Sequence, residues 1–140
     1  MSEKTWYDNV SIGMEVGPFE MILDEDSVRA RIQEVQWEPG DLIDSLNLVP
    51  PGMTIVEHAR MKFRALPKMR SSIWAKSEHE FIKPMKIGEK VIIRGKVVEK
   101  YVKKGRDYLV TEYETVNEAG ELLMRSRETG TLVEWRFHFT

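Results

Sequence analysis

Five residues are the candidates for exchanging protons with a substrate. Glu57 and His58 are neighbours, His79 follows on a later segment, and Asp41 and Asp44 lie in a loop upstream of all three. A carboxylate and an imidazole that reach the same water molecule can act on it as general base and general acid. These residue types therefore favour proton-transfer chemistry, and the five residues are the catalytic candidates.

Glu57 and His58 also have a simpler, structural interpretation. Both lie in a segment with helical spacing, so Glu57 can pair with Arg60, and His58 can lie beside Thr54 and Lys62, four residues to either side. Such pairs stabilise a helix without any part in chemistry. We prefer this interpretation for both residues.

The other three candidates have structural interpretations as well. His79 alternates with small and apolar residues in the pattern of a strand, which favours a structural role. Asp41 and Asp44 belong to a loop that contains Pro39-Gly40 and Pro50-Pro51, where aspartate is a common turn residue. This loop is also rich in aliphatic side chains between residues 42 and 49, so it must pack on the core or lie in an interface.

A sheet and two helices are expected to position these residues. Alternation of apolar and polar residues and the intervening turns predict five strands, at Glu15–Leu23, Ser71–Lys83, Val91–Tyr101, Arg106–Val116 and Glu121–Val133. The last four are expected to form an antiparallel meander. Its first reversal is predicted at Lys83-Pro84 and Gly88, because proline cannot donate to a ladder and glycine tolerates positive φ.

The two helices have clear boundaries in the sequence. The first is predicted to start at Asp24, which can cap it, and to end near Gln36 before Pro39-Gly40. The second is predicted between Pro50-Pro51-Gly52 and Pro67. Its apolar residues form two adjacent lines, Met53, Val56 and Phe63 in one, and Ile55, Ala59 and Leu66 in the other. Two lines predict burial on more than one side, as in a helix surrounded by a curved sheet.

The composition limits the class of protein. A chain of 140 residues forms one domain, and a net charge of −2 does not suggest nucleic acid or an anionic membrane as a partner. The absence of cysteine excludes disulfides, thiolate metal sites and a cysteine nucleophile. No apolar run approaches the roughly 20 residues of a membrane span, and the N-terminus lacks the apolar core of a signal peptide. We expect a soluble, cytoplasmic protein.

Four segments in order resemble one family. Val10-Ser-Ile-Gly-Met-Glu-Val-Gly-Pro18 resembles the entry segment of the MaoC-like dehydratases, and Pro50-Pro-Gly-Met53 resembles their lead into the central helix. Glu80-Phe-Ile-Lys-Pro84, followed by Ile87-Gly-Glu-Lys-Val91, is similar to their strand turn, and Asn117-Glu-Ala-Gly-Glu121 to their late turn. The resemblance covers nearly the whole chain.

This resemblance implies an α+β hot-dog fold, a single domain over residues 1–140 in which an antiparallel sheet wraps around a central helix. It implies a homodimer or higher oligomer that acts on acyl thioesters of CoA or of acyl carrier protein, in fatty acid metabolism. Such lyases add water to a 2-enoyl thioester or remove it from a 3-hydroxyacyl thioester, without a metal or a further cofactor. Backbone N–H groups at the start of the central helix, here Gly52 and Met53, would hold the thioester oxygen.

The resemblance also suggests a role for a basic hairpin. Lys103, Lys104 and Arg106 could hold the phosphates of CoA, because ammonium groups and a forked guanidinium suit a diphosphate. Charged hairpin tips are common on soluble proteins, so a solvated turn is the simpler interpretation. The eight methionines suit an adaptable acyl tunnel, although methionine is more often core filler.

The sequence departs from the family at its catalytic pattern, Asp-x4-Asn-Pro-x-His. The corresponding loop, Trp37–Pro51, contains Asp41 and Asp44 but no histidine. Three hypotheses remain open. The chain is a hydratase or dehydratase that pairs Asp41 or Asp44 with His58 or His79, or it is a catalytically silent subunit that binds acyl-CoA or completes a heteromer. The third hypothesis is an acyl-CoA thioesterase that uses Glu57, by similarity to hot-dog thioesterases with a carboxylate on this helix.

Overall fold

The structure is a computed structural model that describes residues 6–36, 38, 45–66 and 71–133. Its helices are α1 (Trp6–Asn9), α2 (Glu25–Glu34) and α4 (Ile55–Ala65), and its strands are β1 (Glu15–Ile22), β2 (Ser71–Phe81), β3 (Lys90–Lys103), β4 (Arg106–Asn117) and β5 (Leu122–Val133). The predicted helices and strands are therefore present, with ends within a few residues of the expected ones. No helix within these ranges is long and apolar enough to cross a membrane.

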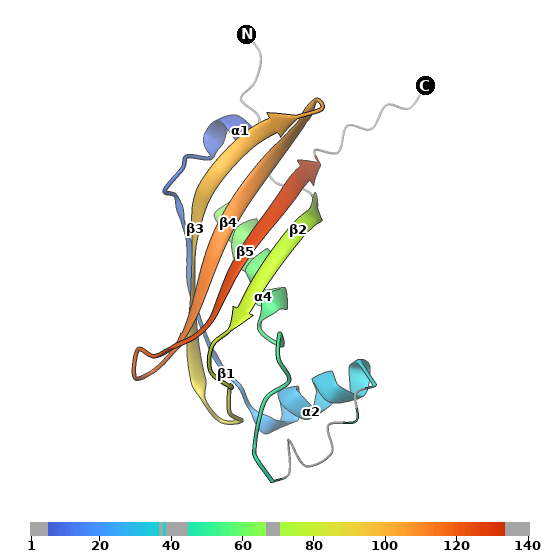
Figure 1. Ribbon diagram of the computed structural model, residues 1–140, viewed down its shortest axis with the longest axis vertical. Coiled ribbons are helices and arrows are strands. Elements are labelled where there is room, and N and C mark those ends of the chain that lie inside the picture. The colour runs from blue at the N-terminus through green and yellow to red at the C-terminus, as the bar shows by residue number, and fades with distance from the viewer. Residues whose placement is uncertain (1–5, 37, 39–44, 67–70, 134–140) are drawn as a thin grey trace.

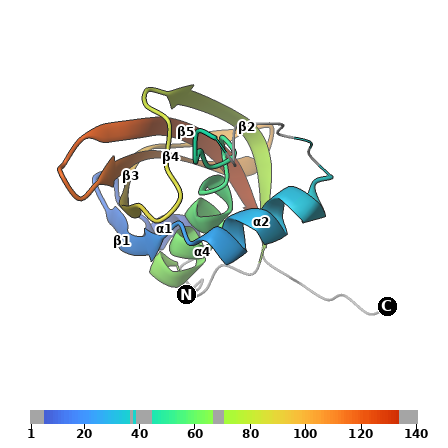
Figure 2. The same cartoon turned by 90° about the horizontal axis from the view of Figure 1, so that it is seen from below.

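The five strands form one antiparallel sheet in the order β1-β3-β4-β5-β2. The sheet curves, and α4 lies against its concave face (Figure 1). Viewed from below, α2 crosses the open end of this curved sheet beside the start of α4 (Figure 2). This is the predicted α+β arrangement, a sheet wrapped around a central helix.

The predicted meander is wrong at its first connection. Strands β3, β4 and β5 follow one another as hairpins, but β2 pairs with β5 and not with β3. Both edges of β3 are occupied, by β1 and β4, so β2 cannot pair with it and lies at the outer edge of β5. The segment 82–89 does reverse the chain, with Gly88 at φ 88°, and it also carries the chain across the ends of two strands.

The two later turns form as expected. In the hairpin between β3 and β4, Lys104 and Gly105 both have positive φ, 51° and 75°, as a tight two-residue turn requires. In the turn between β4 and β5, Gly120 has φ 81°, and the Asn117 side chain accepts a hydrogen bond of 2.9 Å from the Glu121 amide. These turns fix the register of the three central strands.

Helix α2 starts at the predicted cap. The Asp24 carboxylate accepts hydrogen bonds from the amide and the hydroxyl of Ser27, at 3.0 and 2.7 Å. These bonds hold the pKa of Asp24 below its ordinary value, because they stabilise the charged form. Val28 is buried and attaches the helix to the core.

The segment before β1 packs on the core. Its short helix α1 leads to Val10, which is buried in one of two apolar clusters. That cluster lies between β1, β3, β4 and α4, and the second lies nearer α2 and comprises Leu23, Val28, Val49, Met85, Val91, Leu123 and Met124. Val49 thus shows that the aliphatic loop before α4 packs back on the core at this point.

The burial predicted for helix α4 is confirmed only in part: Leu66, at the end of one predicted apolar line, is buried in the core, but much of the other line is exposed. The buried residues of the helix itself are Glu57, His58, Met61 and Lys62, whereas Val56 and Phe63 from the predicted apolar line are 40% and 37% exposed. A helix can bury charged residues only where partners for them exist. The sheet must therefore carry polar groups opposite α4.

Candidate functional site

Polar residues of the sheet meet α4 along three cross-strand rows of the concave face. The pairings place these rows side by side, as Ile93, Thr115, Met124 and Phe81, then Gly95, Tyr113, Ser126 and His79, then Val97, Thr111, Glu128 and Ser77. The first row is mainly apolar and the others become polar towards β5 and β2. Helix α4 adds His58 and Lys62 to the polar side.

His58 and Glu128 form a buried pair. His58 Nδ1 lies 2.7 Å from Glu128 Oε2, and the two residues are 0% and 3% exposed. The His58 ring stacks on Tyr113 with centroids 4.1 Å apart and planes within 3°, and the Tyr113 hydroxyl donates to the His58 carbonyl oxygen at 3.3 Å. Burial raises the pKa of Tyr113 well above its ordinary value, and the nearby Glu128 carboxylate adds to this effect. The imidazole is thus fixed on one face by Tyr113 and at one nitrogen by Glu128.

Two glycines leave space for the side chains of Tyr113 and Lys62. A Cβ atom at Gly95 would lie 2.7 Å from the Tyr113 ring, and one at Gly130 would lie 3.3 Å from Lys62 Nζ. Lys62 is buried and donates to Ser72 Oγ at 3.3 Å. Burial lowers the pKa of Lys62 from its ordinary value, although the Glu128 carboxylate acts in the opposite direction.

His79 lies at the edge of the cluster, on β2. Its Nδ1 is 2.7 Å from Ser126 Oγ, and its ring centroid is 6.4 Å from that of Phe81. Burial lowers the pKa of His79 from its ordinary value; Glu128 opposes this shift and His58 adds to it. The imidazole is only half-buried, so among the three described members of the acid–base set it is the most accessible to a ligand arriving at the edge of the sheet.

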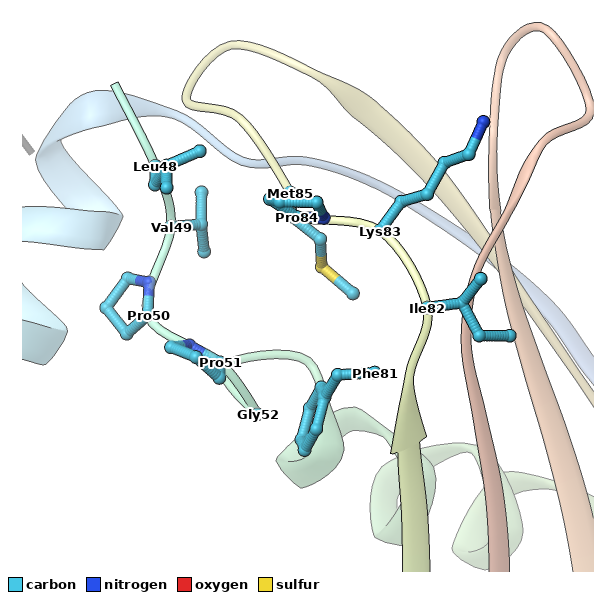
Figure 3. A pocket seen from close by; sticks show the side chains of 10 residues that line it. All are labelled: Leu48, Val49, Pro50, Pro51, Gly52, Phe81, Ile82, Lys83, Pro84 and Met85. Atoms are coloured by element: carbon cyan, nitrogen blue, oxygen red, sulfur yellow. The ribbon is translucent and has the colours of Figure 1, made fainter. Parts of the chain in front are cut away.

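An apolar pocket of about 260 Å³ opens beside the start of α4. It lies between two segments, and its lining is Leu48, Val49, Pro50, Pro51 and Gly52 on one side and Phe81, Ile82, Lys83, Pro84 and Met85 on the other. The Val49 amide donates to the Met85 carbonyl oxygen at 2.8 Å, which joins the segments. Figure 3 shows the side chains of Val49 and Met85 directed into the space between them, with Phe81 near Gly52.

The structure separates the two groups of predicted binding residues. Gly52 lines the pocket and Met53 follows it, whereas Lys103, Lys104 and Arg106 are at the hairpin at the other end of the sheet (Figure 1). Strand β3 runs between these ends, and its twelve residue steps from Val91 correspond to roughly 40 Å. In a single chain the hairpin therefore does not join the pocket in one site.

The catalytic candidates are also distributed. Glu57 bonds to Arg60 at 2.8 Å, the predicted structural pairing. The His58 ring stacks on Tyr113 of β4, a contact that the sequence did not predict. Asp41 and Asp44 lie outside the described residues. Within the described residues, no group of three or more His, Asp and Glu side chains is placed to hold a metal ion.

Sequence reasoning missed Glu128 and Tyr113. A signal for Glu128 was present: Met124, Ser126, Glu128 and Gly130 alternate with Arg125 and Arg127, so the strand pattern places Glu128 on the inner face. A carboxylate at an inner position requires a partner, and a polar residue on the buried side of α4 is the natural one.

Comparison with known proteins gives matches in structure but not in sequence. No protein-family model matches the chain, and no curated protein matches it significantly. The monoamine oxidase regulatory protein from Archaeoglobus fulgius is similar with a TM-score of 0.78 at 13% identity, over 94% of this chain and 96% of that one. A MaoC-like dehydratase from Rhodospirillum rubrum gives 0.73 at 17%, over 93% and 97%. The HadBC (3R-hydroxyacyl-ACP dehydratase) complex from Mycobacterium tuberculosis gives 0.72 at 19%, over 87% and 96%.

Identities this low show a shared fold and not a shared activity. The similarity nevertheless extends over nearly the whole of each chain, and it includes several enzymes of one kind. The resemblance seen in the sequence is thus confirmed at the level of fold: this chain has the hot-dog fold of the MaoC-like dehydratases.

Proposed function

We propose that this chain is a MaoC-like hydratase or dehydratase that acts on an acyl thioester of CoA or of acyl carrier protein. It adds water to a 2-enoyl group or removes water from a 3-hydroxyacyl group. The observation that carries the proposal is the apolar pocket beside the start of α4, because a pocket lined by Val49, Met85 and Phe81 suits an acyl chain. Solved structures of this fold whose names describe hydratases and dehydratases support it.

The thioester is the substrate, and the reaction needs no further cofactor. His79 is the accessible imidazole, because it is half-buried and its ring lies near that of the pocket residue Phe81. Asp41 and Asp44 remain candidates for the carboxylate, since Asp44 precedes the pocket residue Leu48 by only four positions. A carboxylate and an imidazole would then share the acid and base roles.

Hydration of crotonyl-CoA by the purified chain tests this function, followed as loss of the enoyl absorbance. Acyl-CoA should also raise the melting temperature of the chain. Leu48→Glu places a charge in the pocket and should weaken acyl-CoA binding at least tenfold. Val102→Glu is the matched control, because Val102 is exposed near the opposite end of the sheet. Equal binding by the two variants would exclude this pocket as the acyl site.

A catalytically silent subunit is the second candidate. It is favoured by the burial of His58 and Glu128, which are closed to solvent within this chain. Such a subunit would bind acyl-CoA and rely on a second hot-dog chain for its acid–base pair. Clear turnover by the chain alone would exclude this role, whereas a rise in melting temperature with acyl-CoA and no turnover would support it.

Both candidates involve association between chains. Strand β2 is an edge strand, and its Trp74 and Phe81 are exposed, as are Val56 and Phe63 on α4. Exposed apolar side chains beside a free strand edge favour a second chain as partner, either a copy of this one or a catalytic subunit. Sedimentation of the purified chain distinguishes a stable homo-oligomer from a monomer that awaits another partner.

A further inference from the structure

Among the residues that the structure describes, three buried polar atoms around α4 have no hydrogen-bond partner. They are Thr54 Oγ1, His58 Nε2 and Thr115 Oγ1, and all three residues are 0% exposed. Leaving such a group unsatisfied is unfavourable, because on burial it loses its hydrogen bonds to water and gains none in return. Three of them in one region of a small core require an explanation, such as a bound polar molecule.

The three residues are related through the helix, the sheet and the His58–Tyr113 stacking. Thr54 precedes His58 by one turn of α4, and Thr115 is the next inner-facing residue of β4 after Tyr113, on which His58 stacks. Glu128, whose hydrogen bond is to His58 Nδ1, belongs to the cross-strand row on the other side of Tyr113 from Thr115. The two nitrogens of an imidazole point in nearly opposite directions, so Nε2 is directed away from Glu128.

Two of these residues are related to the apolar pocket through the chain and the sheet. Thr54 is two residues after Gly52, which lines the pocket. Thr115 pairs with Met124, and Met124 pairs with Phe81, which also lines it. Thr54 is thus close along the chain to one lining residue, and Thr115 lies in the same cross-strand row as another, two strands away.

We propose that Thr54, His58 and Thr115 form a site for one oxygen atom, that of water or of the 3-hydroxyl group of a bound acyl thioester. His58 Nε2 is the proton acceptor and donor of this site, and Glu128 is its positioning residue. This inference rests on the proposed function and deepens it, since it assigns the acid and base roles to His58 with Glu128 in place of His79 with Asp41 or Asp44.

The chemistry of this site balances without a further reactant. With Glu128 accepting a hydrogen bond from Nδ1–H, the neutral imidazole leaves Nε2 free to accept a proton. During hydration the water oxygen bonds to C3 of the 2-enoyl thioester, one water proton goes to Nε2, and the π electrons move towards the thioester carbonyl. Nε2 then returns the proton to C2. Glu128 stabilises the imidazolium formed between these steps, and dehydration is the reverse sequence.

The tautomer of His58 tests the site without reference to activity. In ¹⁵N spectra of the full chain at neutral pH, His58 should carry its proton on Nδ1 and show a hydrogen-bonded, unprotonated Nε2. The double variant Thr54→Val and Thr115→Val should shift the Nε2 resonance. Thr131→Val should not, because that hydroxyl donates to the Asp107 carbonyl oxygen elsewhere. A proton on Nε2, or no response to the double variant, would overturn the site.

Kinetics test the role of the site in catalysis. Glu128→Gln keeps the shape of the side chain and should lower kcat for crotonyl-CoA about 100-fold, with acyl-CoA binding unchanged, because only proton transfer is affected. The double threonine variant should lower kcat in the same direction, and Thr131→Val should retain it.

The outcomes separate this inference from the proposed function. Wild-type protein that neither binds nor hydrates acyl-CoA would overturn the proposed function. Wild-type protein that hydrates crotonyl-CoA, with full kcat in Glu128→Gln, would overturn only the role of His58 and Glu128. If the wild-type protein binds acyl-CoA but does not hydrate it, the catalytic role of His58 and Glu128 is overturned together with the hydratase activity. The chain is then a catalytically silent subunit.

Discussion

Removing the Glu128 carboxylate should destabilise the chain more than removing any exposed carboxylate. In Glu128→Ala, His58 Nδ1 loses its partner at 2.7 Å, and the buried ammonium of Lys62 loses the nearby opposite charge. Breaking a buried charged pair by removing one partner typically costs 3–5 kcal/mol, because the remaining group stays buried and uncompensated. Lys62 can respond by losing its proton, because burial already lowers its pKa, so we expect the lower end of this range, about 3 kcal/mol.

Urea unfolding at a fixed protein concentration measures this loss. For a chain of this length, about 3 kcal/mol corresponds to a fall in melting temperature of roughly 10 °C. Glu128→Gln should lose less, about 1–2 kcal/mol, because the amide oxygen still accepts the hydrogen bond from Nδ1–H. The loss of stability in Glu128→Gln measures the effect of removing the charge. The further loss in Glu128→Ala measures the effect of removing the hydrogen-bond acceptor.

The matched control is Glu20→Ala. Glu20 pairs with Lys90 at 3.2 Å, but its side chain is 58% exposed, and such pairs contribute under about 1 kcal/mol. If Glu128→Ala lost no more free energy of unfolding than Glu20→Ala, Glu128 would not be the counter-charge of a buried cluster. The explanation that α4 buries its polar side because the sheet supplies a compensating charge would then be refuted.

Three further variants probe the same region. Gly95→Ala places a Cβ atom 2.7 Å from the Tyr113 ring, so urea unfolding should show a loss of about 1–3 kcal/mol, and an unchanged midpoint would contradict the close packing. Burial lowers the pKa of Lys62 below 10.5, so the unfolded chain binds its proton more tightly, and stability should rise as the pH approaches 10.5 from below. Lys62→Met should remove this rise in the free energy of unfolding with pH. Above pH 10.0 the raised pKa of Tyr113 makes stability fall as the pH rises, but it does so in both proteins and therefore cancels from their difference. Burial likewise lowers the pKa of His79, so stability should fall as the pH drops below 6.5, and unfolding of His79→Gln at a series of pH values should show a weaker fall.

Local signals in the sequence predicted most of the fold. Asp24 with Ser27, and Gly105 and Gly120 at their turns, act within a few residues, so the ends of α2, β3, β4 and β5 followed from them. The place of β2 did not follow, because its pairing with β5 is decided by which strand edge is free, and no local residue encodes that choice.

The buried face of α4 was mispredicted in part, for a related reason. Val56 and Phe63 form an apolar line, and the periodicity rule directs such a line to the core. The rule does not count the polar residues on the facing strands. Glu128 and Tyr113 provide partners for His58, so the charged side of the helix packs inward and the apolar line faces out. The candidate site was therefore half visible in the sequence, as His58, and half dependent on a long-range contact.

The strand order also determines when the sheet can close during synthesis. Strand β2 is complete once the chain has reached Phe81, but it lies next to β5, which ends at Val133. The ribosome must therefore make 52 further residues, from Phe81 to Val133, before β2 is paired along its whole length, and such long-range pairing is slow. The carboxylate that compensates the buried side of α4 belongs to the same late strand. Until β5 emerges, the nascent chain holds an unpaired strand and a helix whose charged side has no counterpart, and a chain cut short in β5 would keep both exposed to chaperones and proteases.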